Sequence, residues 1–422
     1  MKMWKRVAIW MLRLVVGGVF VLSGFVKMID LWGFVFKIEE YLGVWDMSQP
    51  RTIVLVAALL ISGYEFVLGS LLVMGCYKRT APWGLMVSMA MMLPLTFYLW
   101  IADPVSDCGC FGEFLTLTNG ETLLKNVFIT IGLVALIKWN YRLKESLFNP
   151  AIQWLVGAWV SLYILVIGLY GYNVQPLLDF RSFPVGTALV ADEAEADEGG
   201  YRFVYEKDGE RRKFGIDELP DSTWTFVDRL EPESAGKSHG SLLTVFDGEE
   251  DDVTEDVITA DGYEILLVIP EPLRADISYS YTVNEIAEYA DSAGIAMIGL
   301  LGTGSRGIER WRDMSMAEYP CYTVEDTQLK ELSRGGMSVV VLDNGVIVSK
   351  TTLSSMDLQA VESPASEDAF ISELAGYSRG WFKWFNWIFF GGLLMLYMFQ
   401  GLIIAIRLKI KGKYRQKHAK NA

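Results

Sequence analysis

Apolar stretches that alternate with short polar segments dominate the pattern of this chain. A helix needs about 20 consecutive apolar residues to cross a bilayer, and six stretches reach that length. They cover residues 7–27, 52–75, 82–102, 121–139, 152–172 and 384–407. The first is longer than a signal-peptide core and no small-residue cleavage site follows it, so we expect it to be retained. The pattern predicts a polytopic α-helical membrane protein with six transmembrane helices.

The segment between the fifth and sixth apolar stretches has the pattern of a folded polar domain. Up to residue 261 it is irregular, with short alternating stretches at 201–205, 211–214 and 224–227 that predict a small β-structure. Residues 191–200 offer nothing to a core and are expected to form a solvated loop. From residue 262 onward, strands and helices alternate. We expect strands at 264–269, 295–301, 319–324, 338–342 and 346–350, and helices at 281–293 and 305–316.

This β-α-β-α-β-β order is typical of a thioredoxin-like domain, but the two features that make such a domain catalytic are missing. After the first strand, where such domains carry Cys-x-x-Cys, residues 270–276 read PEPLRAD, without a cysteine. The position before the final hairpin, usually a cis-proline, is occupied by Gly336 and Met337. We therefore expect residues 262–360 to form an α/β thioredoxin-like ectodomain that binds or docks a partner.

Charge divides the chain in the same way as hydrophobicity. Residues 173–380 hold 41 Asp and Glu against 16 Lys and Arg, a balance of 16 − 41 = −25, which leaves −14 + 25 = +11 for the rest. The segments before the first stretch, between the second and third, between the fourth and fifth, and after the sixth are all basic. Basic loops remain in the cytoplasm, so both termini are expected there. The acidic domain argues against a nucleic-acid partner.

Two of the four cysteines, Cys108 and Cys110, stand in the hexapeptide 107–112, DCGCFG, between the third and fourth stretches. The alternation of helices places them on the outer, disulfide-permissive side, where the pair could exchange electrons with other thiols. An inert packing motif is the alternative. A disulfide closing so short a loop constrains little chain entropy. Zinc needs about four ligands and the chain has only two histidines, so no metal site is expected.

The other two cysteines are expected to pack rather than react. Cys76 lies beside Lys78 on the cytoplasmic side, where it would act as a small apolar residue. Cys321 stands in an apolar, strand-like stretch and should be buried. Its pairing with Cys108 or Cys110 remains an alternative.

Two charged residues fall inside apolar stretches. Glu65 lies near the middle of the second stretch, where an ionised carboxylate is costly. Lys27 lies near the outer end of the first, from where it could extend to the lipid headgroups. Glu65 has two interpretations: a structural contact with a polar group of the bundle, or a proton-handling carboxylate beside a quinone or ligand pocket. Lys27 is a candidate for contacting the same ligand.

With these features, residues 7–140 resemble the DoxX family, and specifically its branch similar to the methylamine-utilisation protein MauE. The resemblance is carried by DCGCFG, by Ser23-Gly24-x-x-Lys27 and by Glu65 within GYEFVLG. It implies a four-helix membrane bundle similar to that of vitamin K epoxide reductase, a role in making or maintaining disulfides of exported proteins, and a quinone as electron acceptor. Unlike vitamin K epoxide reductase, the chain has Cys-x-Cys and no second outer cysteine pair in the bundle.

The full arrangement is similar to DoxX membrane proteins of the Bacteroidota that carry a thioredoxin-like periplasmic domain. The shared features are DFR at 179–181, GT at 186–187 and TW at 223–224. This resemblance implies a bacterial inner-membrane protein with residues 173–380 in the periplasm. The expected division is a four-helix domain at 1–145, a fifth helix at 150–173, a β-rich accessory region at 174–261, the thioredoxin-like domain at 262–360, a sixth helix at 381–407 and a basic tail at 408–422.

Two functions are consistent with these features. In the first, Cys108 and Cys110 accept electrons from periplasmic thiol proteins and pass them toward a membrane quinone, while Glu65 handles protons. In the second, the protein is a non-catalytic membrane scaffold or an accessory subunit of an envelope or secretion complex. It would then bind its partner through the acidic thioredoxin-like ectodomain. In both, the lipid bilayer surrounds the apolar helices.

Overall fold

The computed structural model divides the chain into two compact units. One comprises Met1–Phe180 with Ser378–Ala422, and the other comprises Arg181–Tyr377. The residues described are 3–47, 49–105, 108–143, 146–189, 202–207, 210–214, 224–230, 243–248, 251–259, 261–302, 304–362, 364, 366–375 and 380–420. The expected loop 191–200 lies outside them.

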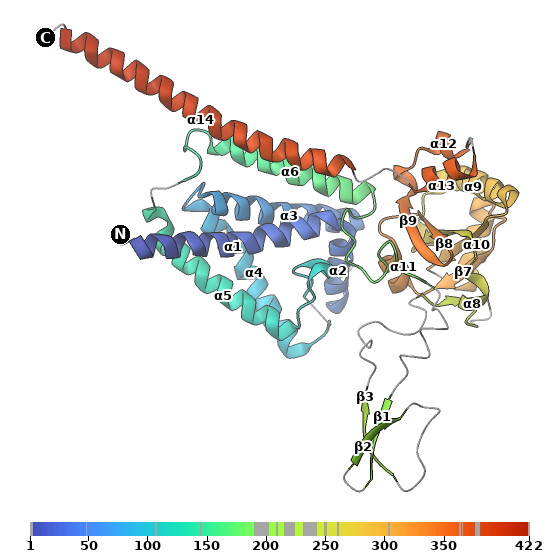
Figure 1. The fold of residues 1–422 in the computed structure, drawn as a ribbon. Coiled ribbons are helices and arrows are strands. Elements are labelled where there is room, and N and C mark those ends of the chain that lie inside the picture. The colour runs from blue at the N-terminus through green and yellow to red at the C-terminus, as the bar shows by residue number, and fades with distance from the viewer. Residues whose placement is uncertain are drawn as a thin grey trace. The chain divides into compact units, whose positions relative to one another are not determined.

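Six helices of the first unit are long and apolar enough to cross a membrane, which confirms the predicted class (Figure 1). Each begins or ends within a few residues of its predicted limits, except that the last continues beyond the apolar stretch. They are α1 (Met3–Ile29), α3 (Arg51–Met74), α4 (Thr80–Ala102), α5 (Asn119–Trp139), α6 (Gln153–Asn173) and α14 (Gly380–Lys420).

Glycines allow α1 and α3 to approach closely. A Cβ atom added to Gly24 would lie 2.5 Å from the Ser62 carbonyl oxygen, and one added to Gly69 would lie 2.9 Å from that of Gly17. Small residues at such positions let membrane helices pack backbone against backbone. The close packing makes polar side chains on these two helices direct neighbours inside the bundle.

A further helix, α2 (Leu31–Val44), follows α1 almost without interruption and was not predicted. Its apolar stretch has only 14 residues, too short to span a bilayer. The Asp30 side chain caps it by accepting a hydrogen bond of 3.0 Å from Gly33 N. Buried Leu31, Phe34 and Val35 hold the helix against the rest of the unit.

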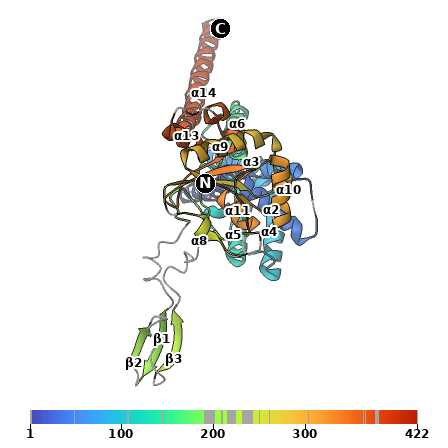
Figure 2. The same ribbon diagram turned by 90° about the vertical axis from the view of Figure 1, so that its right-hand side faces the viewer.

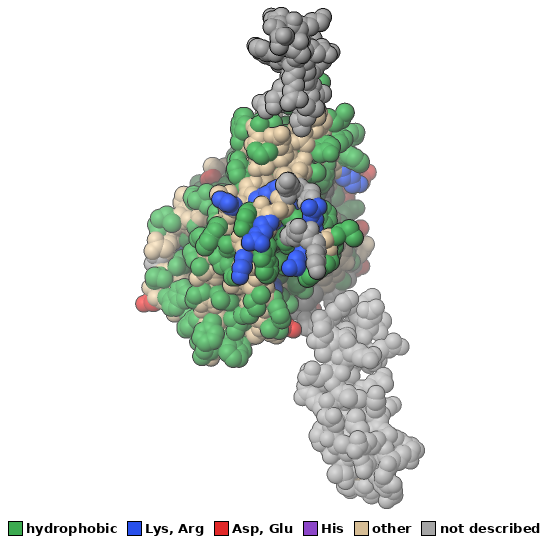
Figure 3. All heavy atoms as spheres, turned by 90° about the vertical axis from the view of Figure 1, so that its left-hand side faces the viewer, with side chains coloured by type: hydrophobic (Ala, Val, Ile, Leu, Met, Phe, Trp, Pro, Cys, Tyr) green, Lys and Arg blue, Asp and Glu red, His purple; other side chains and the backbone are tan. Residues whose placement is uncertain are grey.

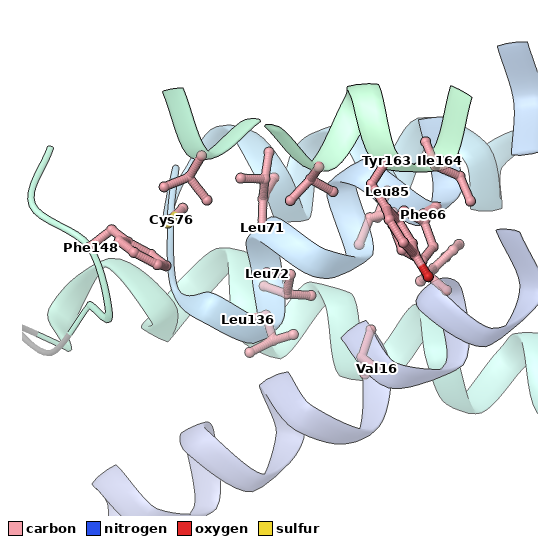
Figure 4. Packing of buried hydrophobic residues seen from close by; sticks show 14 of the residues in the cluster. Val16, Phe66, Leu71, Leu72, Cys76, Leu85, Leu136, Phe148, Tyr163 and Ile164 are labelled. Atoms are coloured by element: carbon pink, nitrogen blue, oxygen red, sulfur yellow. The ribbon is translucent and has the colours of Figure 1, made fainter. Parts of the chain in front are cut away.

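The core of the membrane unit is formed by aliphatic and aromatic side chains from several helices. Figure 4 shows Leu71, Leu72 and Leu136 packed together, with Cys76 beside Phe148. Cys76 is fully buried and its thiol is free, as expected of a packing residue. Nearby, the buried Arg13 guanidinium donates to the Leu72 carbonyl oxygen at 3.1 Å, near the end of α3.

Polar contacts fix α14 along α6. The Tyr163 hydroxyl donates to Asn386 Oδ1 at 2.7 Å, and Trp159 Nε1 donates to the Phe389 carbonyl oxygen at 3.1 Å. The last spanning helix is therefore part of the membrane unit, although more than 200 residues separate it from α6 in the sequence.

Basic side chains gather at the end of the membrane unit from which α1 starts. Figure 3 shows Lys and Arg side chains there, ringed by apolar ones. Arg79, before α4, and Arg142, after α5, lie close to one ring: their guanidinium carbons are 5.2 and 5.6 Å from the Tyr141 ring centroid. The basic segments between α3 and α4 and between α5 and α6 thus lie together in space, as an alternating set of helices requires.

The second unit contains a mixed sheet of six strands in the order β4-β7-β6-β5-β8-β9. Its strands are β4 (Val245–Phe246), β5 (Tyr263–Ile269), β6 (Ala296–Leu301), β7 (Cys321–Val324), β8 (Ser338–Asp343) and β9 (Val346–Thr352). Strands β5, β6 and β7 are parallel, while β8 is antiparallel to β5 and β9 to β8. The inner order β6-β5-β8-β9 is that of a thioredoxin-like fold, which confirms the predicted fold class.

The last two strands form the predicted hairpin. Its turn residues Asn344 and Gly345 have φ angles of 51° and 75°. A turn with both central residues in the left-handed region matches the twist of the paired strands. The strong turn signal in the sequence therefore located this hairpin correctly.

Helices cover both faces of the six-stranded sheet. One core is formed with α9 (Ser280–Ala293), α10 (Ser305–Ser315) and α13 (Glu367–Leu374), the other with α8 (Thr254–Val257) and α11 (Asp326–Leu332) (Figure 2). Helices α8, α11 and α13 and the short α12 (Leu358–Glu362) were not predicted.

The accessory region contributes strands to two different sheets. Strands β1 (Arg202–Lys207), β2 (Glu210–Phe214) and β3 (Thr225–Leu230) form a separate antiparallel sheet at the three stretches expected to be strands. Strand β4 joins the edge of the larger sheet, and Ala188 makes a β-bridge with Val346. The limits 262–360 remain a prediction, since the compact unit is longer.

Candidate redox site

The two cysteines of the hexapeptide are joined in a disulfide in the loop between α4 and α5. Their Cα atoms are 5.5 Å apart. Gly109, between them, has a φ of 61°, a conformation that glycine adopts without strain. A Cβ atom there would also lie 2.6 Å from Lys37 Cγ of α2. The sequence Cys-Gly-Cys is thus required both by the turn and by the helix packed against it.

The two sulfur-bearing residues differ in exposure. Cys108 is 7 % exposed and packs with Leu99 and Val105, whereas Cys110 is only partly buried. The Tyr41 hydroxyl of α2 donates a hydrogen bond to the Cys108 carbonyl oxygen. The loop therefore holds Cys108 inside and leaves Cys110 the more accessible member of the pair.

Inside the bundle, Lys27 and Glu65 form a buried ion pair. Lys27 Nζ lies 2.9 Å from Glu65 Oε2, and the two residues are 2 % and 3 % exposed. The expected extension of Lys27 to the lipid headgroups is therefore wrong, because its ammonium turns inward to the carboxylate. The ammonium also lies 4.9 Å from the Phe34 ring centroid. Buried charges are tolerated when they are paired and hydrogen-bonded in this way.

Ser23 connects this ion pair to the disulfide loop. Its Oγ lies 2.9 Å from Glu65 Oε2 and 2.7 Å from the Cys110 carbonyl oxygen, both within hydrogen-bonding distance. A serine hydroxyl has one proton to donate, so it can serve only one of these acceptors at a time. The structure thereby brings together all four residues expected to form the site: Lys27, Glu65, Cys108 and Cys110.

Lys125 of α5 is a site residue that the sequence reasoning missed. Its Nζ lies 4.4 Å from the ring centroid of Phe111, the residue after Cys110. A lysine within a predicted spanning helix is itself a signal of function. Tyr41 and Lys37 were missed for another reason, because the helix that carries them was not predicted.

The second unit offers no comparable thiol site. Residues Pro272–Arg274 form a short 3₁₀ turn where thioredoxin-like catalysts carry their cysteines. Cys321 is buried and free, and burial raises the pKa of its thiol. A neutral, buried thiol is a poor nucleophile. With Cys108 bonded to Cys110, the alternative pairing of Cys321 with either is not formed.

Metal ligation can be examined only within the described part of the chain. There, no group of three or more His, Cys, Asp and Glu side chains could hold an ion. Bonded to each other, the two cysteines have no thiolate to offer.

Comparison with known proteins gives a match to the membrane unit. The family model for methylamine utilisation protein MauE matches residues 5–138, from α1 to the end of α5. A domain of unknown function (DUF8463) matches residues 200–231. No curated protein matches. A crystal structure from Burkholderia cenocepacia, provisionally described as a thioredoxin reductase, is 14 % identical and covers 46 % of this chain and 98 % of its own. Its TM-score of 0.21 is too low to support an argument.

Proposed function

Because the chain carries a MauE-family membrane domain over residues 5–138, we propose that it is a membrane thiol–disulfide oxidoreductase acting through Cys108 and Cys110. The observation that carries the proposal is the disulfide itself, with the Ser23 hydroxyl lying between its Cys110 carbonyl oxygen and the buried Lys27–Glu65 pair. An inert disulfide would not need a charged pair buried at such cost behind it. The link to the DoxX family and to the Bacteroidota belongs to the same proposal.

Exposure favours Cys110 as the sulfur that is attacked. A thiolate of the substrate dithiol bonds to Cys110 Sγ, the bond between the two cysteines breaks, and its electron pair goes to Cys108 Sγ. The second substrate thiolate then attacks the first substrate sulfur, and Cys110 leaves as a thiolate. The substrate is oxidised to a disulfide, the protein pair is reduced by two electrons, and the two protons of the substrate thiols are released.

Return of the pair to the disulfide needs an acceptor of two electrons, for which we propose a membrane quinone. Bound beside the loop, a quinone would take up two electrons and two protons and become a quinol. Lys27 was expected to contact it, but that ammonium is 2 % exposed and bonded to Glu65. The partly buried Lys125 is the donor on the spanning helices that better fits a quinone carbonyl. Glu65 would supply or accept protons within the bundle.

Thiol trapping in intact cells tests the proposal. Cys108→Ser should accumulate mixed disulfides, because its Cys110 thiolate can attack the disulfide of an oxidised substrate protein, which releases one substrate thiolate, and Cys108 is no longer there to attack the mixed disulfide and free the substrate. Cys110→Ser should accumulate far fewer, since Cys108 is buried. Cys321→Ser is the matched control and should behave as the unaltered protein. Trapped species would be identified by non-reducing electrophoresis and mass spectrometry.

A Cys108–Cys110 pair that stays fully oxidised in cells, whether the quinone pool is oxidised or reduced, would contradict the proposal that the protein is an oxidoreductase. So would an unchanged periplasmic thiol profile in both single-cysteine variants. The proposal also places the protein in the bacterial inner membrane, with both termini in the cytoplasm and residues 173–380 in the periplasm. The basic end of the membrane unit supports that orientation.

A second candidate function, a docking scaffold, is favoured by one observation on the thioredoxin-like domain. Around the position where catalysts carry their cysteines, Leu273, Ile277 and Tyr281 are 67 %, 46 % and 68 % exposed. Exposed apolar side chains grouped in this way often mark a protein interface. A partner recovered in mild detergent with the Cys108→Ser/Cys110→Ser variant, but lost with Leu273→Ser/Tyr281→Ser, would favour the scaffold.

A further inference from the structure

An ammonium without a carboxylate partner lies beside the disulfide loop. Lys125 is on the second turn of α5, partly buried, and among the described residues its one close contact is the face of the Phe111 ring. A cation within a spanning helix is costly unless something compensates it. A ring face gives only part of that compensation. The position therefore requires an explanation beyond packing.

Two other lysines near the loop are paired with carboxylates. Lys27 is bonded to Glu65 at 2.9 Å, and Lys37 of α2 is bonded to Glu40 at 2.9 Å. With Glu65 neutralised by Lys27, the three charged groups Lys27, Glu65 and Lys125 carry a net charge of +1. The loop itself contributes Glu113, which has its own contacts. The excess positive charge of the cluster is thus that of Lys125.

The contact with the Phe111 ring places this charge near Cys110. Phe111 is the neighbour of Cys110 in the chain, and its ring lies 4.4 Å from Lys125 Nζ. Ser23 Oγ, 2.9 Å from Glu65 Oε2, also lies 2.7 Å from the Cys110 carbonyl oxygen. While the disulfide is closed, no carboxylate of the described residues forms an ion pair with this ammonium.

We propose that Lys125 is a positioning residue that stabilises the Cys110 thiolate formed when the disulfide opens. The inference rests on the proposed thiol–disulfide function. It names Lys125 as the group that favours the reduced form of the Cys108–Cys110 pair. The last step of exchange leaves the electron pair of the broken sulfur–sulfur bond on Cys110 Sγ as a negative charge. A nearby cation favours that thiolate, which makes Cys110 a better leaving group and the pair a stronger oxidant.

The alternative interpretation is that Lys125 has no role at the disulfide and that its ammonium extends to the lipid headgroups on the outer side of the membrane. Lysines near helix ends commonly do so, and Lys125 lies only about 9 Å from the start of α5 at 1.5 Å per residue. The contact with the Phe111 ring turns the ammonium toward the loop, which favours the thiolate. The two interpretations differ in what removal of the charge does to Cys110.

The test uses the purified full-length protein in lipid nanodiscs, reduced with dithiothreitol. Alkylation of Cys110 is followed against pH by mass spectrometry of its peptide, and the dithiol–disulfide equilibrium is measured in glutathione buffers. Lys125→Met should move the pH midpoint of alkylation upward and slow alkylation at pH 7 by roughly fivefold. It should also shift the equilibrium toward the disulfide by a similar factor. Lys125→Arg should restore both values.

Lys138→Met is the matched control, because Lys138 is an exposed lysine of the same helix that lies over the Trp139 ring. Equal alkylation profiles and equilibria in Lys125→Met and Lys138→Met would overturn the inference. The readouts need only a chemical reductant, so they are separate from the test of function in cells. If the pair does not cycle in cells, but its alkylation and its equilibrium in vitro change in Lys125→Met, the proposed function is contradicted and the inference on Lys125 is supported.

Discussion

The Lys27–Glu65 ion pair is the strongest single constraint inside the membrane unit. Both side chains are almost completely buried, and each satisfies the charge of the other at 2.9 Å. Removing one partner of such a pair leaves an uncompensated charge, which typically costs about 3–5 kcal/mol, whereas replacing both can be nearly neutral. The presence of this ion pair therefore predicts that single substitutions are harmful and that the double substitution is tolerated. It does not show that the pair adds to the net stability.

We expect Lys27→Met to lower the free energy of unfolding by about 3–5 kcal/mol, because Glu65 would lose its buried ionic partner. Lys27→Met/Glu65→Leu should recover most of that loss. Stability would be measured by titration with denaturing detergent, with Lys138→Met as the exposed control. Equal losses in the single and double variants would show that the pair is not the cause.

Glu264 of β5 makes the second unit sensitive to pH. It is 1 % exposed, Oε2 accepts a 3.2 Å hydrogen bond from Thr259 N, and Oε1 has no partner among the described residues. Burial raises the pKa of this carboxyl from 4.5 to about 7. The folded state therefore holds its proton over a pH range in which the unfolded state has lost it. This contribution to stability is complete below pH 4.5 and is lost as pH rises through 7.

Glu264→Gln should accordingly stabilise the second unit at pH 8, by an amount of order 1 kcal/mol, and leave it unchanged at pH 4. Hydrogen exchange of the β5 amides in the full-length protein measures this. Glu285, an exposed carboxylate of α9, gives the control Glu285→Gln. A gain at pH 8 that persists undiminished at pH 4 would mean that titration of Glu264 is not its source.

At the scale of elements, the approach of α1 to α3 decides whether the site exists. Gly24 is next to Ser23, and Gly69 is one turn from Glu65, so the residues that permit close packing are adjacent to those that form the hydrogen bonds. A wider separation of the two helices would break the contacts of Ser23 and Lys27 with Glu65 together.

Gly24→Val should therefore destabilise the membrane unit by about 1–3 kcal/mol through overpacking and should raise the rate at which Cys110 is alkylated after reduction. Gly18→Val on the same helix is the control, because nothing lies within 4 Å of the Cβ position there. Comparable effects from both substitutions would indicate a general loss of helix propensity instead of a loss of the α1–α3 contact.

At the scale of the whole molecule, the two compact units differ in charge as they differ in environment. The membrane unit is basic at one end, and the residues between α6 and α14 are strongly acidic. Two spanning helices, α5 and α6, lie between the α4–α5 loop and the second unit. Both must then face the same side of the bilayer.

Labelling with a bilayer-impermeant maleimide in spheroplasts checks this orientation. Ser278→Cys, on an exposed turn of the second unit, should be labelled from outside. Tyr141→Cys, 44 % exposed between α5 and α6, should be labelled only after the membrane is permeabilised. The reverse pattern would invert the topology and place Cys108 and Cys110 in a reducing compartment, which would remove the basis of the proposed chemistry.

The sequence by itself determined the membrane class, the six spanning segments and the thioredoxin-like order of the second unit. These features depend on the length of apolar stretches and on the local periodicity of apolar residues, and both can be read from one continuous segment of the sequence. Helix α2 was not predicted, because a stretch of 14 residues is too short to be recognised as a membrane-spanning helix.

Only the tertiary structure decided how the site is assembled. Lys27 and Glu65 are 38 residues apart in the chain, and Ser23 and Cys110 are 87 apart, so no local pattern could show that they touch. The same holds for Lys125, which reaches the disulfide loop from another helix. Each residue type was visible in the sequence, but its partner was chosen by the packing of the helices. That packing turns a lysine expected at the headgroups into half of a buried ion pair.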